Sequence, residues 1–236
     1  MSNESVKSNT DERKGLRLLL TSAGVNNETI RRALDDLLGK PVGECRALCI
    51  PTAMYGHPSV GPGVKTWEFI SGNSENPMVE LGWKSVGILE LTALPSINQE
   101  VWKPLVQDAD VLLVSGGDAL YLSYWMKKSG MAELLPSLKA VYVGMSAGSM
   151  VMSPNIGEEF IGWTPPQGRD EALGLVDFSL FPHVDHEMLP GNTMSHAKIW
   201  ASKIPSTGYA IDDQTAIKVV NGHIEVVSEG NWRLFN

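Results

Sequence analysis

The sequence has only two cysteines, Cys45 and Cys49, and they are four positions apart. If the segment between them is extended, their Cα atoms lie roughly 13 Å apart, too far for a disulfide. A disulfide between the two is therefore excluded, and we expect Cys49 to be a small buried thiol on a strand.

The sequence also lacks long apolar runs and basic clusters. No apolar stretch approaches the ~18 residues of a membrane span, and the polar start MSNESVKSNTDERK has no apolar core of a signal peptide. Nineteen basic residues stand against 27 acidic ones, a net charge of -8. These features argue against nucleic acid or a membrane as partner. We expect a cytoplasmic protein with a flexible polar N-terminal tail over 1–14 and a single domain over 15–236.

What the sequence does contain is an alternation of short apolar runs and amphipathic stretches. Runs typical of buried parallel strands are LRLLLTS, RALCIP, SVGILEL, DVLLVSGGD and AVYVG. Stretches typical of helices are NNETIRRALDDLLGK, an irregular region near 65–83, NQEVWKPLVQD, ALYLSYWMKKSG and MAELLPSLK. This order predicts a mainly parallel sheet with helices on both faces.

After residue 150 the pattern changes. DFSLFPH is typical of one more strand, and SHAKIWASK is typical of a helix. The runs QTAIKVV and HIEVV alternate on either side of Asn221 and Gly222, a pair that favours a tight hairpin turn. The fold class predicted is α/β, with helices on both faces of the sheet and a C-terminal β-hairpin.

The stretch GMSAG, from Gly144 to Gly148, matches the GxSxG nucleophile elbow and lies between a predicted strand and a helix. Glycines at both ends let the strand and helix backbones approach closely, so that the hydroxyl of Ser146 stands clear of the sheet. The N–H of Ala147 opens the helix and is directed to where an oxyanion would form.

A second glycine pair, Gly116 and Gly117, follows the preceding strand. Neighbouring parallel strands would place this loop beside the elbow, where Gly117 could donate a second N–H to the oxyanion. The same SGGD segment can also simply open a helix, with Asp118 near its N-cap.

A serine hydroxyl needs a base, usually histidine, to act as a nucleophile. His183 ends the apolar run FSLFP and is predicted to leave a strand at the sheet edge that carries the elbow. His57, His196 and His223 are placed where a solvated side chain is the ordinary interpretation. HVDHE is also similar to half of a metal-binding cluster, but the first half of such a cluster is absent, so no metal and no cofactor are expected.

A carboxylate must orient the base. The candidates are Glu158 and Glu159, in the loop after the elbow helix, and Asp185, beside the histidine. For each of them, a solvated surface carboxylate is an equally good interpretation.

These features together resemble peptidase family S51, which includes the α-aspartyl dipeptidase peptidase E. The matching stretches cover nearly the whole globular chain: LLLTSAG, CIPTA, DVLLVSGGDALYL, VYVGMSAGSMVMSP, ALGLVDFSLFPH and GYAIDDQTAIKVV. The resemblance implies a flavodoxin-like three-layer sandwich of the class I glutamine amidotransferase type. It also implies a small peptide as substrate.

The resemblance assigns roles to individual residues. Ser146 would be the nucleophile and His183 the base, with Gly117 and Ala147 as oxyanion donors. The family's third triad member is taken to be an acid in the loop after the elbow helix, for which Glu159 is the choice and Glu158 the close alternative.

The residues expected to bind substrate are Gly116, Asp118, His196 and Lys198, and the sequence departs from the family at Asp118 and around His196 and Lys198. Asp118 stands where the family usually has asparagine. SHAK stands where the aspartyl dipeptidases place an arginine for the substrate's aspartate, and Lys198 offers no planar fork. Strict preference for an N-terminal aspartate is therefore not expected.

Three functions follow from these observations. The leading one is a serine dipeptidase that acts near a free N-terminus. The alternatives are an esterase of the α/β-hydrolase type, with Asp212 or Asp213 and His223 as partners of the serine, and a binding protein that kept the scaffold without turnover. The sequence does not determine the oligomeric state, and a homodimer is one option.

Overall fold

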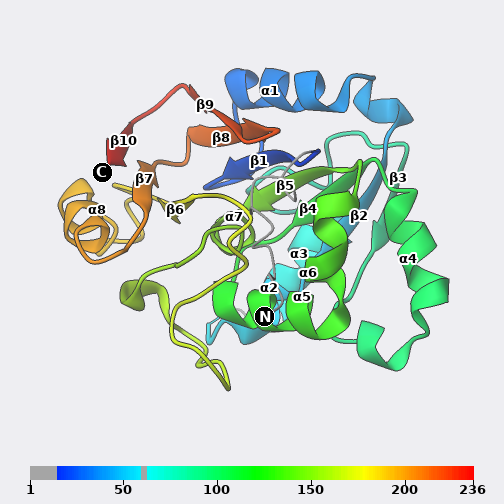
Figure 1. Cartoon of the computed structure of the whole chain (residues 1–236). Coiled ribbons are helices and arrows are strands. Elements are labelled where there is room, and N and C mark those ends of the chain that lie inside the picture. Colours follow the sequence, from blue (N-terminus) through cyan, green and yellow to red (C-terminus); the bar gives the residue numbers. More distant parts are fainter. Residues whose placement is uncertain (1–14, 60–62) are drawn as a thin grey trace, which may run out of the picture.

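A seven-stranded sheet forms the centre of the protein, whose computed structural model describes residues 15–59 and 63–236 (Figure 1). The expected tail over 1–14 lies outside the described residues. The strand order is β3-β2-β4-β5-β1-β8-β9. The strands are β1 (Arg17–Thr21), β2 (Arg46–Ile50), β3 (Ser85–Ile88), β4 (Val111–Val114), β5 (Val141–Met145), β8 (Thr215–Val220) and β9 (His223–Ser228). The first five run parallel to one another, as predicted.

The centre of the sheet is buried on both faces, and every residue of β4 and β5 is buried. Along β1, Leu18 and Leu20 belong to one hydrophobic core, whereas Leu19 belongs to the other. The alternation follows from the two-residue period of a strand, which sends successive side chains to opposite faces. Two separate cores therefore hold helices against the sheet, which gives the three layers expected.

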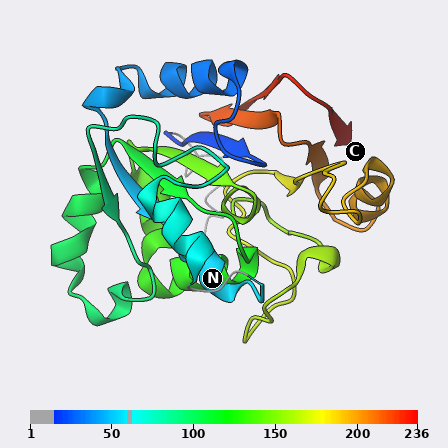
Figure 2. The same ribbon diagram turned by 180° about the vertical axis from the view of Figure 1, so that it is seen from behind.

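Helices cover both faces of this sheet, and Figure 2 shows them from behind. The α-helices are α1 (Glu28–Leu38), α2 (Ala53–Gly56), α3 (Val64–Ser71), α4 (Gln99–Gln107), α5 (Ala119–Ser129), α6 (Met131–Leu134), α7 (Ala147–Met150) and α8 (Met194–Ala201). Short 3-10 helices span Val42–Glu44, Leu94–Ser96, Leu135–Ser137 and Glu158–Phe160. The helix expected near 65–83 ends at Ser71, because Gly72 takes a left-handed conformation with φ 70°.

The ends of α1 carry residues of the types that commonly start and stop helices. The side chain of Asn27 accepts a hydrogen bond from the N–H of Ile30 at 2.9 Å, so it caps the first turn. Gly39 stops the helix in the left-handed conformation, with φ 66°.

The C-terminal hairpin joins β8 and β9 in the predicted register, with Val220 opposite His223. Asn221 and Gly222 form the turn with φ values of 52° and 81°. Positive φ at both central residues is the requirement of the turn type that Asn-Gly favours.

A second, three-stranded sheet lies to one side of the main sheet, next to α8 (Figure 1). It consists of β6 (Phe178–Phe181), β7 (Thr207–Ile211) and β10 (Trp232–Phe235). The strand expected at DFSLFPH is present, but it pairs with β7 rather than extending the parallel sheet. The position beside β1 in the main sheet is taken, since β8 pairs with β1 on the side opposite β5.

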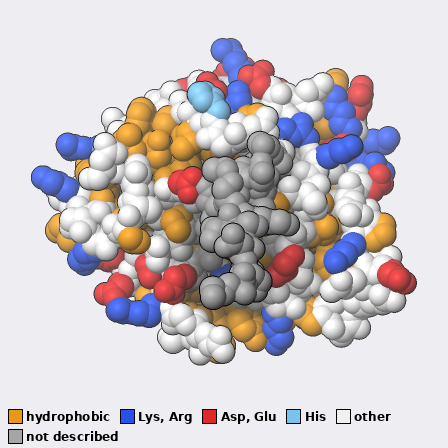
Figure 3. All heavy atoms as spheres, viewed as in Figure 1, with side chains coloured by type: hydrophobic (Ala, Val, Ile, Leu, Met, Phe, Trp, Pro, Cys, Tyr) orange, Lys and Arg blue, Asp and Glu red, His pale blue; other side chains and the backbone are white. Residues whose placement is uncertain are grey.

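On the face shown in Figure 3, basic and acidic side chains are interspersed rather than gathered by sign. Both cysteines are buried and free, as expected. Among the residues described, no helix combines the length and the apolar character required to cross a bilayer.

Candidate active site

The nucleophile elbow predicted from GMSAG is present between β5 and α7. Ser146 has φ 49° and ψ -111°, a strained conformation for a residue with a side chain. A Cβ on Gly144 would lie 2.4 Å from the carbonyl oxygen of Gly148, and one on Gly148 would lie 2.5 Å from that of Val114. The two glycines thus permit the close backbone contact that the sequence predicted.

The glycine loop after β4 lies beside the elbow, as β4 and β5 are neighbours. A Cβ on Gly116 would lie 3.4 Å from the Cβ of Ser146. Gly117 has φ 135°, and a Cβ there would lie 2.3 Å from the carbonyl of Ala53, so only glycine fits. In the described part of the chain, neither the N–H of Gly117 nor that of Ala147 donates to another group. Both amides are therefore available to an oxyanion.

Ser146 and His183 are held by two consecutive residues at the end of β1. The N–H of Ser146 donates to the carbonyl of Thr21 at 2.9 Å, and the N–H of His183 donates to the hydroxyl of Ser22 at 2.9 Å. The Ser22 hydroxyl in turn donates to the carbonyl of Ile211 at 3.1 Å. A single buried hydroxyl thereby joins the small sheet to the main sheet at the point where the imidazole emerges.

We expect Ser22→Ala to destabilise the protein and to reduce activity together. The change leaves the N–H of His183 without its acceptor, which costs about 1–3 kcal/mol, whereas the carbonyl of Ile211 keeps the N–H of Val184 as a donor. Chemical denaturation and the kcat for a dipeptide measure the two effects. Ser96→Ala, which removes an exposed hydroxyl that bonds only within its own turn, is the matched control. A Ser22 variant as stable and active as the wild type would contradict this role.

The carboxylate that contacts the imidazole of His183 is Asp213, and not Glu159 or Glu158, which were expected there. The Nδ1 of His183 lies 2.6 Å from Oδ1 of Asp213. Glu159 is engaged by Lys203, and Glu158 by Arg169 on the exposed surface. Burial raises the pKa of Glu159, but the hydrogen bond and the charge of Lys203, together with a backbone hydrogen bond, outweigh it, and the net shift of this pKa is downward. Both glutamates thus have cationic partners of their own.

The contact with Asp213 also determines which nitrogen of His183 can act as a base. A carboxylate only accepts hydrogen bonds, so the proton of a neutral His183 lies on Nδ1. Nε2 is then left with a free lone pair. This is the tautomer that removes a proton from a serine hydroxyl.

Asp213 follows β7 as His183 follows β6, and these two strands are parallel neighbours. The carboxyl ends of parallel strands meet at one edge of a sheet, so the pair lies together there. Sequence analysis named Asp213 only in the esterase alternative and did not pair it with His183, because TGYAI was not assigned as a strand. A strand predicted at TGYAI and paired with FSLF would have indicated that Asp213 lies next to His183.

A cleft of about 320 Å³ brings the predicted residues together. Ser146, His183, Gly117, Asp118 and Glu159 all line it. Its other lining residues are mostly apolar: Pro58, Ala119, Met150, Phe160, Ile161, Pro182 and Leu189, with His57, Gly162 and Asn192. Ser146, His183 and Gly117 therefore line one space.

Asp118 confirms the helix-opening role that the sequence allowed. Its side chain caps α5 by accepting from the N–H of Tyr121 at 2.8 Å, and it accepts from the N–H of Trp163 at 2.6 Å. Burial raises the pKa of this carboxyl. Asp118 thus ties the loop over the cleft to α5, and both of its oxygens bond to the backbone.

The structure does not bring His196 and Lys198 to the cleft. Thr193 caps α8 and lies 2.7 Å from Nδ1 of His196, which holds this ring on the exposed side of the helix. Neither residue lines the cleft. The expectation that they bind substrate there is therefore wrong for this conformation.

The esterase arrangement is also not formed. Asp213 contacts His183, whereas His223 is exposed at the turn of the β8–β9 hairpin. The residues of the HVDHE segment make different contacts. His183 contacts Asp213, and Asp185 accepts a hydrogen bond from the N–H of Met194 at 3.0 Å. Over 15–59 and 63–236, no group of three His, Cys, Asp or Glu side chains is arranged to hold a metal ion.

Comparisons with known proteins find both a matching family and related chains. The sequence profile of peptidase family S51 matches residues 18–227. An uncharacterized peptidase of Pasteurella multocida (strain Pm70) is 35% identical over 133 residues, which cover 52% of this chain and 61% of the relative. An uncharacterized peptidase of Listeria monocytogenes serovar 1/2a is 31% identical over 119 residues, which cover 46% and 55%. The chain thus spans about three fifths of the length of these relatives.

Two solved structures share the fold. A candidate peptidase E from Listeria monocytogenes EGD-e superposes with a TM-score of 0.68 at 20% identity, covering 91% of this chain and 99% of its own. A peptidase from an acI-B1 Actinobacterium superposes with a TM-score of 0.60 at 22% identity, covering 93% and 91%. At these identities the likeness concerns the fold alone.

Proposed function

Because the chain belongs to peptidase family S51, we propose that it is a serine peptidase that hydrolyses small peptides as a dipeptidase. The observation that carries the proposal is the single cleft lined by Ser146 and by His183, with Asp213 bonded to the far side of the imidazole. A strained serine, a base with a free nitrogen and an orienting carboxylate are the components of covalent acyl transfer.

In the proposed reaction, Nε2 of His183 takes the proton of Ser146 while the hydroxyl oxygen attacks the carbonyl carbon of the peptide bond. The N–H groups of Gly117 and Ala147 donate to the oxyanion of the tetrahedral intermediate. His183 then gives its proton to the leaving amine, and an acyl-enzyme remains. Water, deprotonated by the same imidazole, releases the acyl group and restores the serine.

The lining of the cleft favours a substrate with a positive α-amino group and an uncharged side chain. The acidic groups of the lining are Asp118, whose oxygens accept from backbone N–H groups, and Glu159, which is paired with Lys203, and no Lys or Arg of the described residues lines the cleft itself. An aspartate side chain would lose its hydration there without gaining a cationic partner. The apolar lining instead suits an aliphatic or aromatic side chain.

We expect the kcat/KM for Leu-Ala and for Asn-Ala to exceed that for Asp-Ala by about tenfold or more, equivalent to about 1.4 kcal/mol. A dipeptide library that varies the N-terminal residue, analysed by mass spectrometry, measures this preference. Asn-Ala matches Asp-Ala in shape without its charge, and N-acetyl-Leu-Ala tests the need for a free amine. Fastest cleavage of Asp-Ala would refute the proposed preference.

The same library tests the proposed activity itself. Release of free amino acids from any dipeptide supports a peptidase. Binding of dipeptides without product, by contrast, would favour a scaffold that has lost turnover.

A further inference from the structure

The carboxylate of Asp213 faces two imidazoles. Its Oδ1 lies 2.6 Å from Nδ1 of His183, and its Oδ2 lies 3.4 Å from Nε2 of His186. The two rings meet edge to face, with centroids 6.0 Å apart and an interplanar angle of 85°. Both oxygens of the triad carboxylate are thus next to ring nitrogens, and only one of these belongs to the base.

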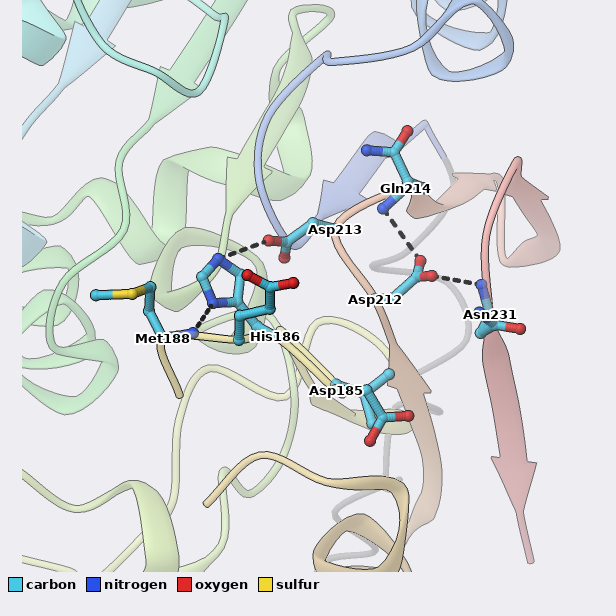
Figure 4. Close-up of a pocket in the computed structure, with 9 residues that line it drawn as sticks. Asp185, His186, Met188, Asp212, Asp213, Gln214 and Asn231 are labelled. Carbon is cyan, nitrogen blue, oxygen red and sulfur yellow. Dashed lines mark hydrogen bonds and ion pairs between the residues drawn. The ribbon is translucent and has the colours of Figure 1, made fainter. Parts of the chain in front are cut away.

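The orientation of the His186 ring determines where its proton lies. The N–H of Met188 donates to Nδ1 of His186 at 3.0 Å, as Figure 4 shows. A neutral ring that accepts at Nδ1 carries its proton on Nε2. Nε2 is the atom next to Asp213, so the ring presents a donor to the second carboxylate oxygen.

The backbone keeps the ring in this place. His183 and Asp185 both take the left-handed conformation, with φ 56° and 57°, and the N–H of His186 donates to the carbonyl of His183 at 3.3 Å. The side chain of Asp185 accepts from the N–H of Met194. This tight turn carries both imidazoles to the same carboxylate.

The other side of the carboxylate opens to a pocket of about 390 Å³ that His186 and Asp213 line (Figure 4). The remaining charged groups in its lining are Asp185, Glu187 and Asp212. Asp212 accepts hydrogen bonds from the N–H of Gln214 and from the hydroxyl of Thr215, so its carboxylate is engaged by residues of the turn in which it lies. Among the residues lining the pocket, His186 is the ring that contacts Asp213.

We propose that His186 is a positioning residue of the triad, which restrains the second oxygen of Asp213 and so keeps the first directed at Nδ1 of His183. The inference rests on the proposed function, because it assigns His186 to the same site. A carboxylate bound at one oxygen can turn about its terminal torsion, which is soft, whereas a carboxylate held at both cannot. Groups that orient a catalytic partner in this way commonly change rates by roughly tenfold or more.

The test compares three variants by their rate of Ser146 labelling with a small fluorophosphonate, a reaction that also needs the base. His186→Phe keeps a ring but removes the donor, and His186→Gln keeps an amide donor but removes the ring. His223→Phe, on the exposed hairpin turn, is the matched control. We expect roughly tenfold slower labelling for Phe, partial recovery for Gln and an unchanged rate for the control.

The order of the two variants separates positioning from packing. If the ring served only to fill space, Phe would replace it better than Gln, so faster labelling of His186→Phe than of His186→Gln would overturn the inference. A wild-type labelling rate in His186→Phe would also overturn it. With a dipeptide, kcat should fall while KM stays unchanged. Normal labelling of the wild type without dipeptide cleavage would refute the peptidase proposal but not the inference, whereas absent labelling of the wild type would refute both.

Discussion

Ser146→Ala is expected to lower kcat for dipeptide hydrolysis by at least about 10³-fold, because the variant has no nucleophile and cannot form an acyl-enzyme. Removing the hydroxyl leaves the contacts of Gly144 and Gly148 in place, so the elbow itself should keep its shape. Alanine at φ 49° is as strained as serine, so stability should change little. Initial rates with the best dipeptide of the library measure the effect.

Covalent labelling tests the role of Ser146 without knowledge of the natural substrate. A fluorophosphonate should add one phosphonyl group to the wild type, as the serine oxygen bonds to phosphorus and fluoride leaves, and intact-mass measurement detects the product. Ser146→Ala should gain none, whereas Ser96→Ala, with its hydroxyl on the surface, should be labelled normally. An equal adduct on Ser146→Ala would place the reactive hydroxyl elsewhere.

Asp213→Asn should be the next most damaging change, with a loss in kcat of about 10²- to 10⁴-fold. An amide nitrogen at this place donates a hydrogen bond, so Nδ1 of His183 would become the acceptor and its proton would move to Nε2. The imidazole could then no longer take the proton of Ser146. Steady-state kinetics at a pH near neutrality measure the loss, and thermal unfolding checks that the fold is intact.

The comparison with Glu159→Gln decides between the two carboxylates. Glu159 pairs with Lys203 and lines the cleft, so its replacement should affect mainly KM and cost far less in kcat than Asp213→Asn. Glu158→Gln, one residue away and paired with Arg169 on the surface, is the control. A kcat loss in Glu159→Gln that exceeds the loss in Asp213→Asn would return the triad role to Glu159.

The parts of the site that sequence analysis predicted are those encoded within a few residues. GMSAG contains the whole elbow, since both glycines that allow the close approach stand beside Ser146. The parallel order of β4 and β5 follows from the alternation of strands and helices, and it placed Gly117 beside the serine. Helix α1 could be predicted equally well, because the residues that start and stop it lie next to it in the sequence.

The parts that were missed depend on pairings between distant segments. Asp213 lies 30 positions after His183, and its neighbourhood IDDQ has the polar composition of an ordinary turn. The pairing of β6 with β7 brings the two side chains together. The sequence of β6, β7 and β10 has no local pattern that shows that these strands form a second sheet rather than part of the main sheet. Likewise, His196 stood at a suitable sequence position, but α8 turns it outward.

The two sheets divide the reactive groups between them, which has a consequence for how activity arises during folding. Ser146 belongs to the large sheet, whereas His183 and Asp213 leave strands of the small one, and Ser22 joins the two. A newly made chain in which only the large sheet has assembled would present a hydroxyl with no imidazole to activate it. Immature molecules of this kind would be inert toward the peptides around them, and hydrolysis would begin only when the last strands arrive.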